Sequence, residues 1–372
     1  MLENNYKCLV YGLSHNKGGV ESIVTSLMNR LHEKISFDVL ISGECSYAED
    51  FESNNIDIIP INPWGINPWR FSTELKKILL NKSYDYIWIN GCLMANRAII
   101  RMSKRYSNAR IITHSHGSSF EEKNFFKFLF LKFLHFYNRS YYLKNVDYPC
   151  CCSTASAEWY YGHKYCSSHR VYTINNGVDT TLFKFDEQKR KDLRRQLGVE
   201  NEYVLLHAGR LTLVKNQKFL LDITKTLKNK GFHFKLLIAG TGELEQELKK
   251  YSQELDIADK VCFLGFRNDV SDLYQASDSF ILTSFHEGLP VTIIEAQATG
   301  LQCFASSRIT READISGLVE FISLDETPDF WSQKIMDTPT LEDREKATLL
   351  VRERKYDLDI ISKSFFDHIL HN

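Results

Sequence analysis

Two carboxylates in the stretch SFHEGLPVTIIEAQATG, residues 284–300, have the type and spacing expected of a ligand site. Glu287 lies in a predicted loop after a strand, and Glu295 lies eight residues further on, inside the helix that should follow. Pro290 suits the first helical turn, and Gly288 lets the backbone approach a ligand closely. Such a helix N-terminus binds anions, while carboxylates accept hydrogen bonds from sugar hydroxyls. Glu295 stands in an otherwise apolar run, which favours ligand binding over a solvated surface charge.

Two cations in HAGRLTLVKNQ, residues 207–217, point to the same chemistry. Arg210 and Lys215 follow a predicted strand and precede a predicted helix. Cations at the carboxyl end of a parallel strand are well placed to bind a pyrophosphate. Surface Arg and Lys are common, so this pair gains its meaning from the two carboxylates.

The elements that must position these residues form two similar halves. In each half, short strands rich in Ile and Val alternate with helical patterns, which predicts doubly wound parallel sheets buried on both faces. We expect strands at residues 7–13, 37–42, 56–61, 84–90 and 109–116, and at 203–210, 234–240, 261–265, 278–284 and 302–306.

The length of 372 residues favours two domains over one core. We predict one Rossmann-like domain over residues 1–180, a second over 181–350, and a C-terminal helical segment over 351–372. The charged stretch 186–199 is expected to be helical and to lie near the hinge between the domains.

Composition excludes several classes of protein. The net charge is −1, with 46 Lys and Arg against 47 Asp and Glu, which gives no overall attraction to nucleic acid. The nine cysteines lack zinc-site spacing, and the N-terminus lacks the features of a signal peptide, so we expect reduced thiols and a cytoplasmic protein. Asp357 and Asp359 form a D-x-D motif, which we assign to helix capping rather than to a metal.

The Arg–x4–Lys pair, the Glu–x7–Glu pair and INNGVD resemble retaining GT-B-type glycosyltransferases of family four. KGGVE, IAGTGELEQEL and FLGFRNDV are similar to the same family, and the resemblance covers nearly the whole chain. It implies an α/β GT-B fold, with two Rossmann-like domains facing across a cleft. Residues 1–180 would form the acceptor-side domain and residues 181–350 the nucleotide-sugar-binding domain, while residues 351–372 would cross back to the first domain. SRITREADI and YDLDIISKSFF are similar to enzymes of exopolysaccharide and capsule synthesis.

The resemblance also implies a role for each matched residue. Arg210 and Lys215 would neutralise the donor's phosphates, Glu287 would hold the transferred sugar, and Glu295 the ribose. His116 in THSHG would face the sugar, with His114 as the second candidate for this role. The catalytic residues implied are His116, Glu287, Arg210 and Lys215.

Further donor-binding positions follow from the same resemblance. Backbone near Phe266 and Arg267 would meet the base, and the glycine turn at residues 18–19 would contact the phosphates. The remaining donor-binding positions are Gly18, Gly19, Gly240, Gly288, Leu289, Pro290 and Val291.

The implied reaction is transfer of a hexosyl unit from a nucleotide diphosphate sugar, expected to be UDP-linked, to a hydroxyl of a glycan or lipid-linked acceptor, with retained configuration. The product would serve bacterial surface polysaccharide synthesis. No cofactor and no bound metal are expected, and the sequence carries no signal for oligomeric state. A UDP-sugar epimerase of the same fold and a non-catalytic sugar-nucleotide-binding protein remain alternatives.

Residues 125–142, FFKFLFLKFLHFYNRSYY, combine aromatic and basic side chains. Phe125, Phe126, Leu129, Phe130, Phe133 and Leu134 could form one broad apolar face, with Lys127 and Lys132 beside it. Interfacial helices have this character, and Arg139 would add to the attraction for an anionic inner membrane surface. A core helix packed on the first sheet is the equally favoured alternative.

Overall fold

The computed structural model describes residues 6–52, 54, 56–118, 120, 122, 124–339 and 343–370. The chain divides into two compact units, one of residues 1–176 with 358–372 and the other of residues 177–357. The boundaries expected from the sequence, after residues 180 and 350, differ from these by four and seven residues. Of the expected C-terminal segment, residues 371 and 372 lie outside the described part of the chain.

The first unit contains one parallel sheet with the order β3-β2-β1-β4-β5-β6-β7. Its strands are β1 (Tyr6–Tyr11), β2 (Ile35–Ile41), β3 (Asp57–Pro60), β4 (Tyr86–Gly91), β5 (Arg110–Ser115), β6 (Tyr148–Cys151) and β7 (Tyr172–Thr173). The central strands β1, β4 and β5 carry the apolar runs that both faces of a parallel sheet require, so the predicted sheet is confirmed.

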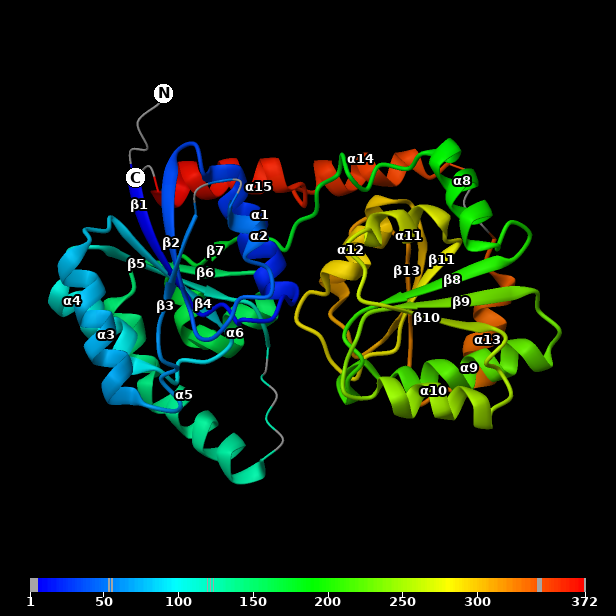
Figure 1. Ribbon diagram of the computed structural model, residues 1–372, viewed down its shortest axis with the longest axis horizontal. Coiled ribbons are helices and arrows are strands. Elements are labelled where there is room, and N and C mark those ends of the chain that lie inside the picture. The colour runs from blue at the N-terminus through cyan, green and yellow to red at the C-terminus, as the bar shows by residue number, and fades with distance from the viewer. Residues whose placement is uncertain are drawn as a thin grey trace. The chain divides into compact units, whose positions relative to one another are not determined.

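Helices cover both faces of this sheet, with α3 to α5 on one face and α1 and α15 on the other (Figure 1). They are α1 (Gly19–Leu31), α2 (Glu49–Glu52), α3 (Pro68–Asn81), α4 (Arg97–Tyr106), α5 (Phe125–Asn145), α6 (Thr154–Tyr161), α7 (His163–Ser168) and α15 (Leu358–Phe365), which continues as a π-helical turn, η3 (Phe366–Leu370). Side-chain caps from Asn67, Asn96 and Ser153 start α3, α4 and α6.

The second unit contains a parallel sheet with the order β10-β9-β8-β11-β12-β13. Its strands are β8 (Tyr203–Ala208), β9 (Phe234–Ala239), β10 (Val261–Gly265), β11 (Ser279–Leu282), β12 (Gln302–Ser306) and β13 (Val319–Ile322). The chain therefore adds strands on one side of β8 up to β10 and then on the other side from β11 onward, which is the doubly wound topology.

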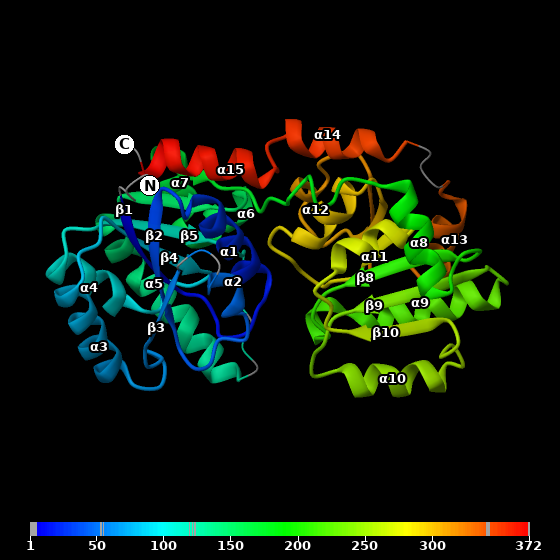
Figure 2. The same cartoon turned by 45° about the horizontal axis from the view of Figure 1, so that its top comes forward.

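Helices of the second unit also lie on both sheet faces, with α9, α10 and α13 on one and α8, α11, α12 and α14 on the other (Figure 2). They are α8 (Glu187–Leu197), the 3-10 turn η1 (Leu213–Lys215), α9 (Gln217–Asn229), α10 (Glu245–Glu254), α11 (Val270–Ala276), α12 (Val291–Ala298), η2 (Arg311–Ala313), α13 (Pro328–Asp337) and α14 (Glu345–Glu353).

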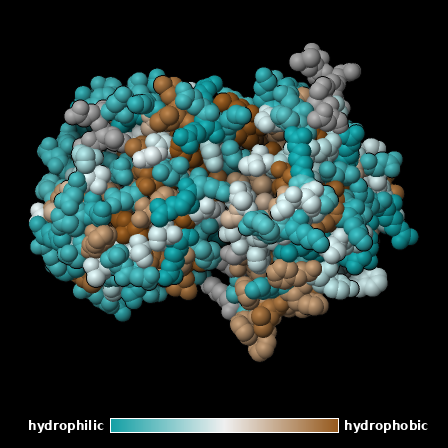
Figure 3. Space-filling model, turned by 180° about the vertical axis from the view of Figure 1, so that it is seen from behind, coloured by the Kyte–Doolittle hydropathy of each residue, from teal (hydrophilic) through white to brown (hydrophobic). Residues whose placement is uncertain are grey.

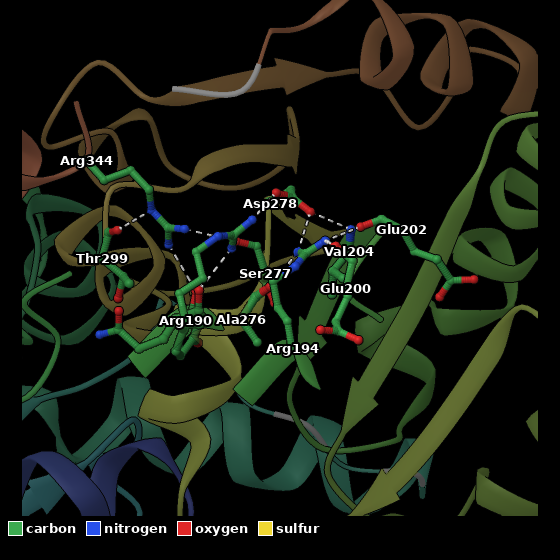
Figure 4. A network of polar contacts seen from close by, with 12 residues as sticks. Arg190, Arg194, Glu200, Glu202, Val204, Ala276, Ser277, Asp278, Thr299 and Arg344 are labelled. Carbon is green, nitrogen blue, oxygen red and sulfur yellow. Dashed lines mark hydrogen bonds and ion pairs between the residues drawn. The ribbon is translucent and has the colours of Figure 1, made fainter. Parts of the chain in front are cut away.

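A buried charge network fixes α8 to the second unit (Figure 4). Arg190 and Arg194 on α8 bind the two carboxylate oxygens of Asp278 at 2.5 and 2.9 Å. Arg344 donates to the carbonyl oxygens of Tyr274, Ser277 and Thr299, and its burial, with Arg190 nearby, lowers its pKa to about 9. The helix expected within residues 186–199 is confirmed as α8, and it is packed within the second unit.

Candidate functional site

The predicted site residues of the second unit come together at the carboxyl ends of β8 and β11. These two strands are adjacent, and the chain turns to opposite sides of the sheet from them, which is where ligands bind in open α/β sheets. The loops after the two strands are joined, since Phe285 N donates to Val214 O at 2.8 Å and the Thr283 hydroxyl to Asn216 O at 3.0 Å.

The central contact of this site joins one predicted cation to one predicted carboxylate. Lys215 Nζ lies 2.5 Å from Glu287 Oε1, with only 19% and 15% of the two side chains exposed. The Ser284 hydroxyl donates to the same oxygen at 2.7 Å. Each group thereby has a defined orientation before any ligand arrives.

Arg210 is exposed and forms no ion pair with any residue that the structure describes. The loop that carries Arg210 is fixed by Gln217, whose Nε2 donates to Arg210 O at 2.9 Å and contacts His207 Nε2 at 3.1 Å. His207 Nδ1 lies 3.0 Å from Ile281 O, and burial lowers the pKa of His207 to about 4. A neutral histidine thus ties the Arg210 loop to β11.

Glu295 lies on α12, one turn from its start, and is partly buried. Its Oε2 accepts a hydrogen bond from the Tyr274 hydroxyl at 2.9 Å, and the same hydroxyl reaches Thr292 O at 3.1 Å. Burial raises the pKa of Glu295 to about 7, although the Tyr274 hydroxyl opposes the shift. The Tyr274 hydroxyl therefore fixes the orientation of the Glu295 carboxyl group on α12.

The turn between Glu287 and Glu295 is formed by Gly288 and three residues with buried or half-buried side chains, Leu289, Pro290 and Val291. Pro290 is the N-cap of α12, directly before the first helical turn in which the sequence placed it. The N-cap makes no side-chain hydrogen bond, which leaves the first turn of α12 without a side-chain cap.

The loops after β9 and β10 complete this edge of the second sheet. Gly240 has a φ of +132°, and a Cβ there would lie 2.1 Å from Gly209 O, so only glycine fits. Phe266 is 61% exposed. Arg267 pairs with Asp269, at 2.7 Å between Nε and Oδ1, which raises the pKa of Arg267 and lowers that of Asp269.

In the first unit, the turn at Gly18 and Gly19 begins α1. Its preceding loop is anchored where Ser14 N donates to Glu21 Oε1 at 2.8 Å. Gly18 has an extended φ of −137°, which any residue adopts, and a Cβ added to Gly19 would meet no atom of the chain within 4 Å. The fold itself therefore does not require glycine at position 19.

His116 lies just beyond β5 and is buried, with Nε2 2.9 Å from Asn90 Oδ1 on β4. Since the amide oxygen is an acceptor, Nε2 carries the proton and Nδ1 is an acceptor without a partner among the described residues. Burial, reinforced by neighbouring His114, lowers the pKa of His116 well below its usual value. His114 instead stacks on Trp88 in the core, with ring centroids 6.1 Å apart, which makes it the weaker candidate for ligand contact.

A cavity of about 320 Å³ opens at the carboxyl ends of β1 and β2. Aromatic and hydrogen-bonding groups line it together: Tyr11, Trp64 and Phe71, with Ser14, Ser42 and Asn62. Aromatic faces beside amide and hydroxyl groups are suited to the apolar faces and the hydroxyls of a sugar.

Neither metal ligands nor a membrane span emerge from the described parts of the chain. Those residues contain no group of three or more His, Cys, Asp or Glu able to hold a metal ion, and no helix long and apolar enough to cross a bilayer. Asp357 accepts a hydrogen bond from the Thr180 hydroxyl, and Asp359 pairs with Arg30 at 2.7 Å. The D-x-D aspartates thus hold separate structural contacts.

Solved structures identify the fold. Anabaena Alr3699/HepE, solved in complex with UDP and glucose, is similar with a TM-score of 0.80 and 20% identity, over 99% of this chain and 100% of that one. WaaG, described as a glycosyltransferase involved in lipopolysaccharide biosynthesis, gives a TM-score of 0.72 at 14% identity, over 98% of this chain and 100% of that one. With its two doubly wound sheets, the chain has the GT-B fold.

Sequence comparison identifies the family. The model described as Glycosyl transferases group 1 matches residues 189–320, and that of Glycosyltransferase Family 4 matches residues 17–182. EpsF of Bacillus subtilis (strain 168), named as a glycosyltransferase, is 28% identical over 327 residues, covering 86% of this chain and 84% of that protein. The chain therefore belongs to the GT-B glycosyltransferases of family four.

A second relative has a more specific name. The Escherichia coli UDP-Gal:alpha-D-GlcNAc-diphosphoundecaprenol alpha-1,3-galactosyltransferase is 28% identical over 240 residues, which cover 63% of this chain and 60% of that enzyme. Its name combines a UDP-sugar donor with a lipid-linked acceptor.

Proposed function

We propose that this glycosyltransferase moves a hexosyl unit from a UDP-linked sugar to a hydroxyl of a glycan or lipid-linked acceptor, with retained anomeric configuration. The Lys215–Glu287 ion pair beside exposed Arg210 is the observation that carries the proposal. A diphosphate would gain two cations there, while the carboxylate released from Lys215 would bind sugar hydroxyls. The UDP-bound structural neighbour and the galactosyltransferase relative support the choice of donor and acceptor.

In the proposed reaction, the acceptor oxygen bonds to the anomeric carbon as the bond from that carbon to the diphosphate oxygen breaks. The acceptor proton passes to the departing phosphate on the same face, which retains the configuration. Arg210, Lys215 and the start of α12 would stabilise the charge that develops on the diphosphate. Glu295 would accept hydrogen bonds from the ribose, and the Phe266–Arg267 backbone would contact the base.

The first unit would supply neutral groups. His116 Nδ1 would accept a hydrogen bond from a sugar hydroxyl, because Nε2 is committed to Asn90. Gly19 would leave room for a phosphate, since neither its conformation nor its neighbours require glycine. The cavity beside Trp64 would bind a sugar of the acceptor.

Thermal shift with UDP-, GDP- and ADP-sugars identifies the donor, which should raise the unfolding temperature by mass action. Arg210→Ala and Lys215→Ala should each lower turnover with that donor at least about tenfold, because each removes a cation from the leaving group. Lys250→Ala is the control, since its side chain is 77% exposed and lies on α10. Full turnover by both site variants, with the fold intact, would refute the proposal.

A further inference from the structure

Helix α5 buries His135, Asn138 and Tyr142 against the rest of the first unit and turns seven large apolar side chains towards solvent. Among its buried residues, Asn138 donates to Met94 O at 2.9 Å and the Tyr142 hydroxyl to Asn96 O at 2.6 Å. The exposed large hydrophobic residues of the helix are Phe125, Phe126, Leu129, Phe130, Phe133, Phe136 and Tyr137. This pattern is the reverse of what a core helix requires, so the core alternative is wrong for these seven residues.

The seven side chains form one continuous surface, here named the aromatic face. At about 100° per residue they occupy an arc of roughly 140° on the helix. Exposed fractions reach 81% for Phe126 and 61% for Phe133. The space-filling view shows a tan and brown projection at the lower edge, where the N-terminal part of α5 lies (Figure 3). An exposed apolar patch of this size marks an interaction surface.

The charged residues beside the aromatic face indicate what kind of partner it binds. Lys127 and Lys132 are exposed and stand at either edge of the arc, and α5 contains no Asp or Glu. Lys127 also pairs with Glu122 at 2.5 Å, so Lys132 is the stronger contributor. Arg139, expected from the sequence to add to this surface, instead donates to Trp159 O at 2.6 Å and is half-buried.

We propose that the aromatic face of α5 docks the protein onto an anionic phospholipid surface. Phenyl rings and leucine would enter the boundary between headgroups and acyl chains, while Lys127 and Lys132 would meet lipid phosphates. A second copy of the chain fits less well, because two such helices would bring lysines together without a carboxylate on either helix. The C-terminal half of α5 holds the helix rigidly, since His135 stacks on Trp159 with ring centroids 4.9 Å apart.

The test is co-sedimentation of the full chain with phosphatidylglycerol vesicles and, separately, phosphatidylcholine vesicles at low salt. Wild type should partition onto the anionic vesicles at least about tenfold better than onto the neutral ones. The triple variant Phe126→Ser, Phe130→Ser, Phe133→Ser should lose at least about tenfold in partitioning, because the inserted area is removed. Its control is Trp69→Ser, Leu80→Ser, Leu349→Ser, at positions 86%, 61% and 62% exposed, which should bind as wild type does.

The charge arm uses Lys127→Glu, Lys132→Glu against the control Lys191→Glu, Lys250→Glu on exposed helices of the second unit. Only the first pair should weaken binding to anionic vesicles. Wild type remaining in the supernatant, or equal losses in test and control variants, would overturn the proposal. A dimer in light scattering that the serine variant dissociates, without vesicle binding, would assign the face to a second copy instead. Because no donor or turnover enters this assay, its outcome is independent of the proposed reaction.

Discussion

The two sheets share a strand order around their switch points, yet their carboxyl edges differ in chemistry. The edge of the second sheet holds charges, with Arg210, Lys215 and Glu287 in its loops. At the edge of the first, His116 is kept uncharged and hydrogen-bonds Asn90, while Lys17 in the loop after β1 is paired with Asp50. The shared topology thus places loops at the same edge of both sheets, and the loop residues give the two edges different chemistry.

The largest expected effect concerns the buried charges of the second unit. Asp278→Ala would leave Arg190 and Arg194 buried without a counter-charge, which costs about 3–5 kcal/mol. Hydrogen exchange should show lost protection in β8 and β11 but not in β4 and β5. Asp325→Ala is the control, because that side chain is 84% exposed. Equal loss in both units would mean that they do not unfold separately.

The next largest expected effect is a difference between the two units in how their stability changes at low pH. Burial lowers the pKa of His114, His116 and His135 in the first unit, so the folded state binds fewer protons than the unfolded one. Each neutral histidine therefore contributes to the free energy of unfolding above about pH 6.5, and this contribution is lost as the pH falls. At a pH one unit below that value, the loss is about 1.4 kcal/mol per histidine. In the second unit, the lowered pKa of His207 has the same effect. The raised pKa of Glu295 has the opposite effect, because the folded state binds an extra proton there and is stabilised as the pH falls through 7.

Hydrogen exchange at pH 7.5 and 5.5, corrected for intrinsic rates, checks this difference. The first unit should lose more protection than the second. A greater loss in the second unit would contradict the assignment of neutral histidines to the first.

Substitutions of Glu287 and Glu295 should have different effects, of about tenfold in a binding constant for Glu295. Glu287→Gln should lower turnover with every acceptor, whereas Glu295→Gln should weaken binding of free nucleoside diphosphate about tenfold, through one lost charged hydrogen bond. Calorimetry with UDP measures the second effect. If Glu295→Gln binds UDP as tightly as wild type does, Glu295 does not hold the ribose.

The smallest expected effect is that of a chelator. If Arg210, Lys215 and the α12 terminus stabilise the leaving group, excess EDTA should leave most of the turnover. Loss of activity that Mn²⁺ or Mg²⁺ restores would show that the charged edge works through a metal instead.

Most of the sheet strands were predictable from the sequence, because buried parallel strands are continuous apolar runs. The charged residues of the candidate site were predictable as well, because they lie in the loops that directly follow these strands. Among the missed elements, β7 has only two residues, while β13 (VEFI) and α13 (PDFWSQKIMD) are short and mix charged with apolar residues. His207 and Gln217 lie within the motif that revealed Arg210, but only the structure shows them facing each other at 3.1 Å. Tyr274 lies 21 positions from Glu295, and no spacing rule joins residues on two different helices.

The aromatic face shows a different limit of prediction from the sequence. Its apolar residues were evident from composition, yet the same residues suit a core helix or a surface one. Which side faces the sheet is decided by Asn138 and Tyr142, whose partners are backbone carbonyls near residues 94–96. Such contacts cannot be inferred from helical periodicity alone.

The placement of α15 has a consequence for how the chain folds. Phe365 packs on Trp88 of β4, with ring centroids 4.9 Å apart, and Phe366 contacts Tyr6 of β1. The first unit therefore draws part of its core from residues that follow the second unit in the chain, whereas residues 177–357 of the second unit form one continuous segment. We expect the second unit to fold from that single segment, whereas the first cannot complete its core until the residues on both sides of the segment are available.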